Sequence, residues 1–477
     1  MALLNVLQTG KSGMSTAKAG IATSGHNIAN ASSEGFSRQR VQSEAAVAKQ
    51  AAGQNGGHFV GEGSRIARVE RINDEYLEKQ LREGARDTAF HEEKQVFLNQ
   101  VEDVFNEMNG DGLNRLIARF HNDFRKLSNE PTSEAIRQSV RESSQAMVRD
   151  FKRLRTEVEG IRGHIDNRIE GSVRELNTLA SECAELNRKI VQAEVQGTDA
   201  ANDLRDRRDL VVKKMNSLVD ITAHKDNQGN LNVDIKGVGP LVTGVVVSDY
   251  SLARHGADQA TGAIDNSLQI ARSAKSDTYI TDQFKGGRIG AQIEARDRAV
   301  NQVLGRLDEL AYSIASAVND LHEKGFTLDG KTGIKFFEGA QQVAGAAERL
   351  GLSKAIEQNV NNIAVALQAG APSDNRNALA IANLQNHHLM NSGHTTVDDF
   401  YNSIVSEVGV ASARNKEALG QQQSIITQLN RVRDQVSGVS IDEETTNLMQ
   451  YQHAFDASAR VIRVADEMMD TVLKLRG

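Results

Sequence analysis

Two histidine-glutamate pairs are the first residues in this sequence whose types suggest chemistry. His91-Glu92 and His322-Glu323 resemble the start of the helical zinc-protease pattern, in which a second histidine follows four residues after the first. Neither pair has that second histidine, so neither predicts a catalytic zinc site. Each pair is instead interpreted as an exposed position on a helix.

Three other features also lack the context that chemistry requires. His387-His388 are adjacent, so they point to different helix faces and make a poor metal pair. The glycine-rich residues 53–63 follow no predicted strand, and we interpret them as a loop rather than a phosphate site. Cys183 is the single cysteine and falls in an apolar helical stripe, which predicts a small buried side chain. The sequence therefore predicts no catalytic residues, no cofactor and no metal, and a protein that is not an enzyme.

The composition favours an elongated, helix-rich molecule. The 477 residues include three prolines, no tryptophan and only 4% aromatic residues, which leaves little material for a large aromatic core. The net charge of −7 comes from interleaved charges of both signs, which argues against nucleic acid as a partner. No apolar run is long enough to predict a membrane span, and the opening residues do not resemble a cleaved secretory signal.

The two ends of the sequence carry the same heptad pattern. Near the N-terminus, large residues seven apart alternate with a second lane of small residues that includes Gly10, Ala17 and Ser24. Near the C-terminus, a large-residue lane is again flanked by a second lane three residues on. Such stripes usually pack within one domain, but these lie at the extreme termini, where most domains fray. Their position favours helices that pair with each other or with neighbouring chains.

An energy estimate predicts that these ends are weakly held in a single chain. Burying about five apolar side chains of the first helix is worth roughly 10 kcal/mol. Ordering the backbone of the same segment costs about 1–2 kcal/mol for each residue. We therefore expect the ends to be disordered in the monomer and ordered on assembly.

Changes in periodicity divide the rest of the chain. Residues 1–50 with 437–477 are predicted to form a terminal coiled-coil domain, and residues 51–219 with 288–436 a helical body, in which 325–372 are mixed turns and short strands. Residues 220–287 alternate between clustered glycines and predict a β-rich outer domain. The predicted fold class is mainly α with a β-rich inserted domain: paired terminal helices, a helical body, and a small β domain at the far or outer end.

Residues 12–41 carry the most specific local pattern. A helix rich in small residues ends in Asn27-Ile28-Ala29-Asn30, and Gly35-Phe36-Ser37-Arg38 follows. A helix stop needs only one asparagine or glycine, whereas the whole string resembles the N-terminal signature of flagellar rod, hook and hook-associated proteins. Further segments resemble the hook-associated members in particular, in the expected order; they lie at residues 202–221, 286–297, 310–325, 373–384 and 436–473.

The resemblance implies a structural subunit of the bacterial flagellum that forms the junction between hook and filament by helical self-assembly. It implies export of the unfolded chain through the flagellar type III channel without a cleaved signal peptide, to an extracellular location. The implied partners are hook protein, hook-associated protein 3, further copies of the chain, and an export chaperone at the C-terminal region, with no nucleic acid and no membrane. The short middle of the chain implies a single compact outer domain.

We expect the assembly interface to consist of the heptad residues and the asparagine segment: Leu7, Met14, Ile21, Asn27, Ile28, Asn30, Leu448, Tyr451, Phe455, Ile462, Ala465 and Met469. Three alternatives stay open at this point. The chain could be a hook or rod protein proper, an intracellular coiled-coil scaffold, or a flagellar subunit with an enzymatic insert. The segments at 202–221 and 286–297 argue against the first, and the asparagine segment against the second. The central region has no candidate motif for the third.

Overall fold

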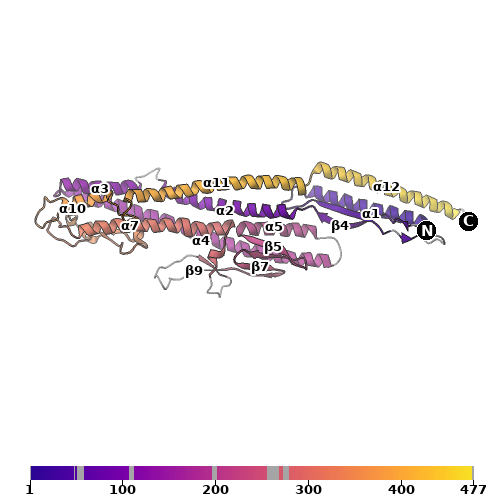
Figure 1. Ribbon diagram of the computed structural model, residues 1–477, viewed down its shortest axis with the longest axis horizontal. Coiled ribbons are helices and arrows are strands. Elements are labelled where there is room, and N and C mark those ends of the chain that lie inside the picture. Colours follow the sequence, from indigo (N-terminus) through magenta and orange to yellow (C-terminus); the bar gives the residue numbers. More distant parts are fainter. Residues whose placement is uncertain are drawn as a thin grey trace.

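A helix of 62 residues, α4 (Glu134–Val195), forms the axis of the molecule. At 1.5 Å per residue it is about 90 Å long. The computed structural model describes residues 2–47, 49–50, 59–106, 112–195, 201–254, 268–271 and 279–474. Helices lie along α4 to form a rod, and both termini lie at one end of it (Figure 1).

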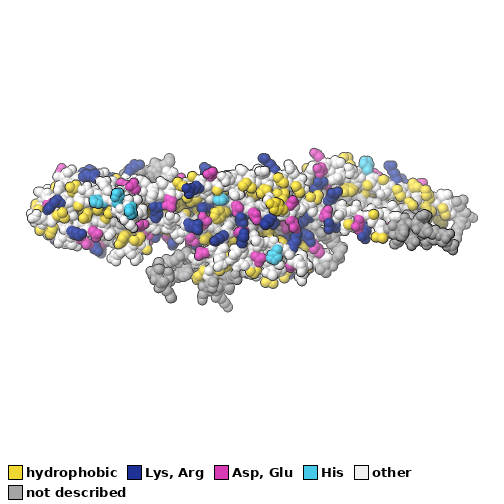
Figure 2. All heavy atoms as spheres, viewed as in Figure 1, with side chains coloured by type: hydrophobic (Ala, Val, Ile, Leu, Met, Phe, Trp, Pro, Cys, Tyr) yellow, Lys and Arg dark blue, Asp and Glu magenta, His cyan; other side chains and the backbone are white. Residues whose placement is uncertain are grey.

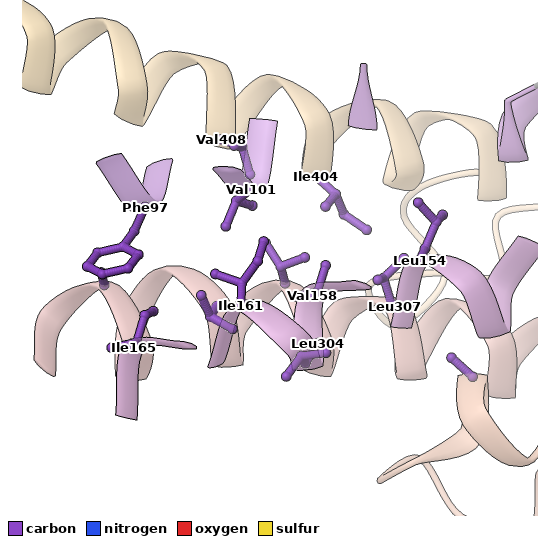
Figure 3. Packing of buried hydrophobic residues seen from close by; sticks show 14 of the residues in the cluster. Phe97, Val101, Leu154, Val158, Ile161, Ile165, Leu304, Leu307, Ile404 and Val408 are labelled. Atoms are coloured by element: carbon purple, nitrogen blue, oxygen red, sulfur yellow. The ribbon is translucent and has the colours of Figure 1, made fainter. Parts of the chain in front are cut away.

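The core of the rod lies where α2 (Glu75–Phe105), α4, α7 (Asn301–His322) and α11 (Val397–Ser437) meet. The apolar residues of α4 recur every three or four positions, so they form one continuous stripe. Figure 3 shows Val158, Ile161 and Ile165 of this stripe packed among side chains of the other three helices: Phe97, Val101, Leu304, Leu307, Ile404 and Val408.

Cys183 belongs to the same stripe, as the sequence predicts. Its side chain is fully buried in the core cluster. Burial raises the pKa of the Cys183 thiol to about 11. The thiol is therefore protonated at neutral pH, where it acts as a small apolar group.

The helix boundaries follow local capping chemistry. Asp74 precedes α2, and its carboxylate accepts hydrogen bonds from the N–H groups of Tyr76 and Leu77. α3 (Leu113–Asn129) begins directly after Gly112 and ends before Pro131. α5 (Asn202–Leu218) follows α4 and packs back against it.

The inserted β region begins directly after α5. Its main sheet is an antiparallel meander of β5 (Ile221–Lys225), β6 (Leu231–Ile235), β7 (Gly239–Thr243) and β8 (Val246–Val247). A second hairpin pairs β9 (Ser251–Arg254) with β10 (Leu268–Ala271), and the short helix η1 (Thr281–Gln283) follows. The meander lies along one side of the rod, against α4 and α5 (Figure 1), whereas the sequence placed it at the far or outer end.

Helical structure resumes at Gly287, close to the predicted boundary. α6 (Gly287–Glu294) continues through a π-helical turn, η2 (Ala295–Val300), into α7. The π-helical turn carries Arg296, which is buried. Arg296 donates hydrogen bonds to Asp166 of α4 at 2.9 Å and to the carbonyl of Leu268 at 2.7 Å, so it ties the β region to the rod.

The end of the rod opposite the termini is formed by α3 and the region between α7 and α11 (Figure 1). That region contains only short elements: β11 (Phe337–Glu338), α8 (Ala346–Arg349), β12 (Gly351–Leu352), α9 (Lys354–Gln358), η3 (Val360–Asn362), α10 (Arg376–Asn383) and η4 (Leu384–Asn386). The predicted mixture of turns and short strands, 325–372, lies within this region, which also contains short helices.

This folded-back region overturns the prediction that His322 is exposed. The chain after α7 covers the end of that helix, and the His322 side chain is fully buried. Its Nδ1 bonds the carbonyl of Ile334 at 2.6 Å, and its Nε2 accepts the N–H of Ala364 at 2.8 Å. Burial lowers the pKa of His322 to about 4, so the ring is neutral.

The other histidines singled out from the sequence also differ in detail from the predictions. His91 is half-buried rather than exposed, and its Nδ1 lies 2.8 Å from the amide oxygen of Asn415 on α11. His387 and His388 follow η4 rather than lying on a helix, and both are exposed. Among the residues that the structure describes, no three histidine, cysteine or acidic side chains cluster as metal ligands would.

The terminal helices form an antiparallel pair at the other end of the rod. α1 (Ala2–Ala29) lies against α12 (Ile441–Lys474), with Gly10 beside Ile462 and Gly20 beside Tyr451. A hairpin of β1 (Gln39–Ala45) and β4 (Ser64–Arg71) packs along α1, extended by β2 (Lys49–Gln50) and β3 (Phe59–Val60). No pattern in the sequence predicted this hairpin. Residues 53–58 of the expected glycine loop, 53–63, lie outside the described residues.

Candidate functional site

The seam between α1 and α12 is built from small residues on one helix and large ones on the other. In α1 the small lane is the most buried, at Gly10, Ala17 and Ser24. A Cβ added to Gly10 would lie 2.6 Å from Cγ1 of Ile462. The absence of side chains in this lane therefore lets the two helix backbones approach closely, while Leu7, Met14, Ile21 and Ile28 are half-buried beside it.

The six C-terminal residues predicted for the interface all lie on this seam. Ala465 is fully buried, and the other five are half-buried: Leu448, Tyr451, Phe455, Ile462 and Met469. The heptad pattern thus identified the face of α12 that packs on α1 of the same chain. A contact of these residues with neighbouring chains stays a prediction.

A second apolar lane of α12 is exposed. It consists of Val461, Val464, Met468 and Val472, whose side chains are between 41% and 53% exposed, and we call it the outer lane. Residues at spacings of three, four and four share one face of a helix. On α1, Leu4 and Val6 are also exposed. Figure 2 shows hydrophobic side chains on the surface at the terminal end of the rod. Apolar side chains in contact with water do not stabilise a single chain, and a group of them marks a contact surface.

Asn27 fastens the end of α1 to the hairpin. Its side chain is fully buried, its Nδ2 donates to the carbonyl of Gln39 at 2.8 Å, and its Oδ1 accepts the N–H of Gln39 at 3.0 Å. This pair of bonds copies the pairing of two strand backbones, so only an amide side chain fits. Asn30, the second predicted asparagine, is half-buried and donates to the carbonyl of His26 at 3.0 Å, which closes the helix.

The turn after α1 docks on α5. Gly35 has a φ of +82°, which favours glycine, and it lies against Leu210. The rings of His26 and Phe36 contact each other edge to face at 5.4 Å. Nε2 of His26 lies 3.2 Å from the carboxylate of Asp203. These contacts join the segment that resembles the flagellar signature to the separate segment at 202–221.

A buried carboxylate completes the joint between the hairpin and α5. Asp206 accepts the N–H of Ser37 at 3.1 Å and a hydrogen bond from Arg71 at 2.7 Å. Arg71 also donates to Asp209 at 2.9 Å. Burial alone would lower the pKa of Arg71, but the two carboxylates outweigh it and raise the pKa, so Arg71 is positively charged at physiological pH. Burial raises the pKa of Asp206, although its hydrogen bonds to Ser37 and Arg71 oppose that shift. The joint between the hairpin and α5 is therefore held by directional polar contacts rather than by an apolar interface along which the two could slide.

Sequence reasoning found some of these residues and missed others. The pattern pointed to Asn27 and Asn30 but not to Gln39, the partner of Asn27. It also did not point to Asp206 and Arg71, which bond each other across 135 residues of sequence. The outer lane was also missed, although the spacing of its residues was a readable signal. The arrangement as a whole offers packing surfaces and fixed polar joints, and these are the properties of a structural contact.

Comparisons with known proteins agree with this arrangement. The family model described as "Flagellar hook-associated protein FlgK helical domain" matches residues 98–337, and "Flagellar basal body rod FlgEFG protein C-terminal" matches residues 434–475. The flagellar hook-associated protein 1 of Bacillus subtilis (strain 168) is 30% identical across 99% of this chain and 98% of its own length. The protein of that name from Salmonella typhimurium is 24% identical across 98% of both chains.

A solved structure supports the fold independently. The flagellar hook junction protein FlgK from Burkholderia pseudomallei superposes with a TM-score of 0.66 at 16% identity, and the match covers 75% of this chain and all of that one. The family model spans half of the chain, and the Bacillus relative is similar over its whole length. The chain therefore belongs to the flagellar hook-associated protein 1 (FlgK) family.

Proposed function

We propose that this chain is a structural subunit of the junction between flagellar hook and filament, and that copies of it assemble through the outer lane of α12 and the exposed end of α1. The observation that carries the proposal is the exposed apolar outer lane beside a seam that is already filled. A second copy is the occupant that the family supports, because a heterologous contact of this kind repeats into a ring or helix.

The partners follow from the same assignment. Hook protein on one side and hook-associated protein 3 on the other are the proposed neighbours, with an export chaperone on the C-terminal region and passage of the unfolded chain through the flagellar type III channel. A single cysteine and terminal helices with little buried surface suit an unfolded passage. The family match over the body, residues 98–337, favours the junction role over that of a hook or rod protein.

We also propose that the terminal helix pair opens readily in the isolated chain. Of the residues in α12, only Glu444 and Ala465 are buried, so the seam has little to hold it closed. Hydrogen exchange is expected to show an opening free energy of at most about 2 kcal/mol for α1 and α12, which is roughly 30-fold protection. The buried stripe of α4 is expected to be protected far more strongly. Equal protection in α12 and α4 would contradict the proposal.

The assembly surface is tested by placing charge on the outer lane. Val464→Asp with Met468→Asp is expected to leave the fold and the thermal midpoint of the rod unchanged, because both side chains are about half exposed. Filament attachment and swimming are expected to be lost, because two charges would have to be buried between copies. Electron micrographs of hooks and a swarming assay measure these outcomes.

A matched control uses the same chemical change at the opposite end of the rod. Val343→Asp with Leu379→Asp alters two apolar side chains of similar exposure outside the terminal helices. Swimming is expected to persist in this control. Normal filaments in the Val464 and Met468 variant would contradict the proposed assembly surface. An equal loss of swimming in the variant and its control would contradict it as well.

A further inference from the structure

The terminal unit, which consists of α1, α12 and the β1–β4 hairpin, meets the rod at three segments that we call together the elbow. Two of them are covalent crossings, residues 72–74 and residues 438–440, and the third is the loop of residues 30–38 between α1 and β1, which docks on α5. Arg38 ends this loop, and its backbone and side chain contact residues at or beside both crossings.

The backbone of Arg38 joins the crossings to each other. Its N–H donates to the carbonyl of Ser437, the last residue of α11, at 3.2 Å. Its carbonyl accepts the N–H of Ile72 at 2.8 Å. The position of this one peptide unit is therefore tied to the start of α2 and to the end of α11.

The side chain of Arg38 grips the first turn of α12. Its Nε donates to Glu444 at 2.6 Å, and its Nη1 donates to Glu443 at 2.7 Å. The carboxylate of Glu444 is buried and that of Glu443 is exposed. Adjacent helical residues point about 100° apart, so a planar guanidinium that holds both fixes the rotation of α12 as well as its position.

The short link between α11 and α12 cannot by itself fix the direction of α12 relative to α11. Gly438 is extended, and a Cβ at this position would lie 2.2 Å from the carbonyl of Asp434. The helix therefore ends sharply, and only residues 438–440 separate α11 from α12. The joint at Asp206 holds the hairpin to α5, and the Arg38 contacts are the ion pairs that extend this hold to the first turn of α12.

We infer that Arg38 is a positioning residue for assembly: it sets the angle and rotation at which the terminal helix pair leaves the rod. The inference deepens the proposed function, since that angle decides how the outer lanes of two copies meet. It does not depend on assembly for its test. Arg40 lies two residues further on, in β1, is exposed, and offers a matched control.

Pulsed electron-spin distances on the isolated chain test the inference. One pair of labels, on cysteines at Ser406 of α11 and Gln452 of α12, spans the elbow, and a second pair, at Lys18 of α1 and Gln452, lies within the terminal unit. All three positions are exposed, and native Cys183 is buried. Sucrose in the buffer favours the closed helix pair.

Arg38→Ala is expected to shift the main peak of the elbow-spanning distance or at least double its width, and to leave the distance within the terminal unit unchanged. Arg38→Lys keeps the charge but loses the planar guanidinium that bonds two carboxylates at once, so a distance distribution of intermediate width is expected. Arg40→Ala is expected to match the parent chain. An unchanged elbow distance in Arg38→Ala, or an equal change in Arg40→Ala, overturns the inference. Broadening of the Lys18 to Gln452 distance also overturns it, because Arg38 would then hold the helix pair together rather than aim it.

Discussion

Phe455→Asp with Ile462→Asp is expected to separate α12 from α1 and to abolish filament attachment while the rod stays folded. Both side chains are half-buried in the seam, and Ile462 lies directly against Gly10. The lost apolar contacts and the two partly buried charges together cost about 4–6 kcal/mol. That cost exceeds the opening free energy of about 2 kcal/mol that we propose for the helix pair.

Circular dichroism and micrographs of hooks measure the two effects of this variant. The helical signal of the terminal segments is expected to fall, and bare hooks are expected in place of filaments. Gln452→Asp with Thr471→Asp adds the same charge to exposed positions of α12 and is the control. Motile cells carrying the Phe455 and Ile462 variant would count decisively against a role of the seam in assembly. The outer-lane variant differs because its seam is intact, so its helical signal is expected to match the parent chain.

Mild acid is expected to destabilise the rod at the end opposite the termini. His121 and His322 are buried, and burial lowers the pKa of each to about 4, from an ordinary 6.5. The unfolded chain therefore binds two protons that the folded chain excludes as the pH falls from 6.5 towards 4. The stabilisation is fully present above pH 6.5, and about 3 kcal/mol for each histidine is lost across this window.

Urea unfolding across this pH range measures the effect. His322→Gln and His121→Asn keep groups that can bond the carbonyls of Ile334 and Ile381, so each is expected to remove about half of the pH dependence contributed by the pair. His453 lies exposed on α12, and His453→Gln is expected to leave the curve unchanged. An unaltered slope in the double variant of His121 and His322 would show that other groups cause the acid sensitivity.

Regular periodicity made most of the fold readable from the sequence. The stripe that includes Phe151, Val158 and Cys183 predicted the buried face of α4, and the glycine spacing at 220–287 predicted a meander of short strands. Heptads at both ends predicted which faces of α1 and α12 meet. These signals are local, because each residue lies close in the sequence to the others that share its face.

The features that the sequence did not predict depend on contacts between distant segments. Strand β1 alternates poorly and pairs with β4 across the glycine-rich stretch, so no local pattern marked it as a strand. His322 is buried because the chain after α7 folds back over it, which its immediate neighbours do not reveal. Arg38 and its partner Glu444 are separated by most of the chain. The heptad pattern gave the lanes of α12 that face α1, but it did not single out the exposed outer lane, since a heptad count does not say which lane is filled within the chain.

The length of α4 turns the elbow into a lever. A change of about 5° at one end of a helix roughly 90 Å long moves its other end by about 8 Å, which is close to the spacing between packed helices. In the assembly that we propose, a few degrees at the elbow therefore move the far end of each subunit by about the distance between one packed helix of a neighbour and the next.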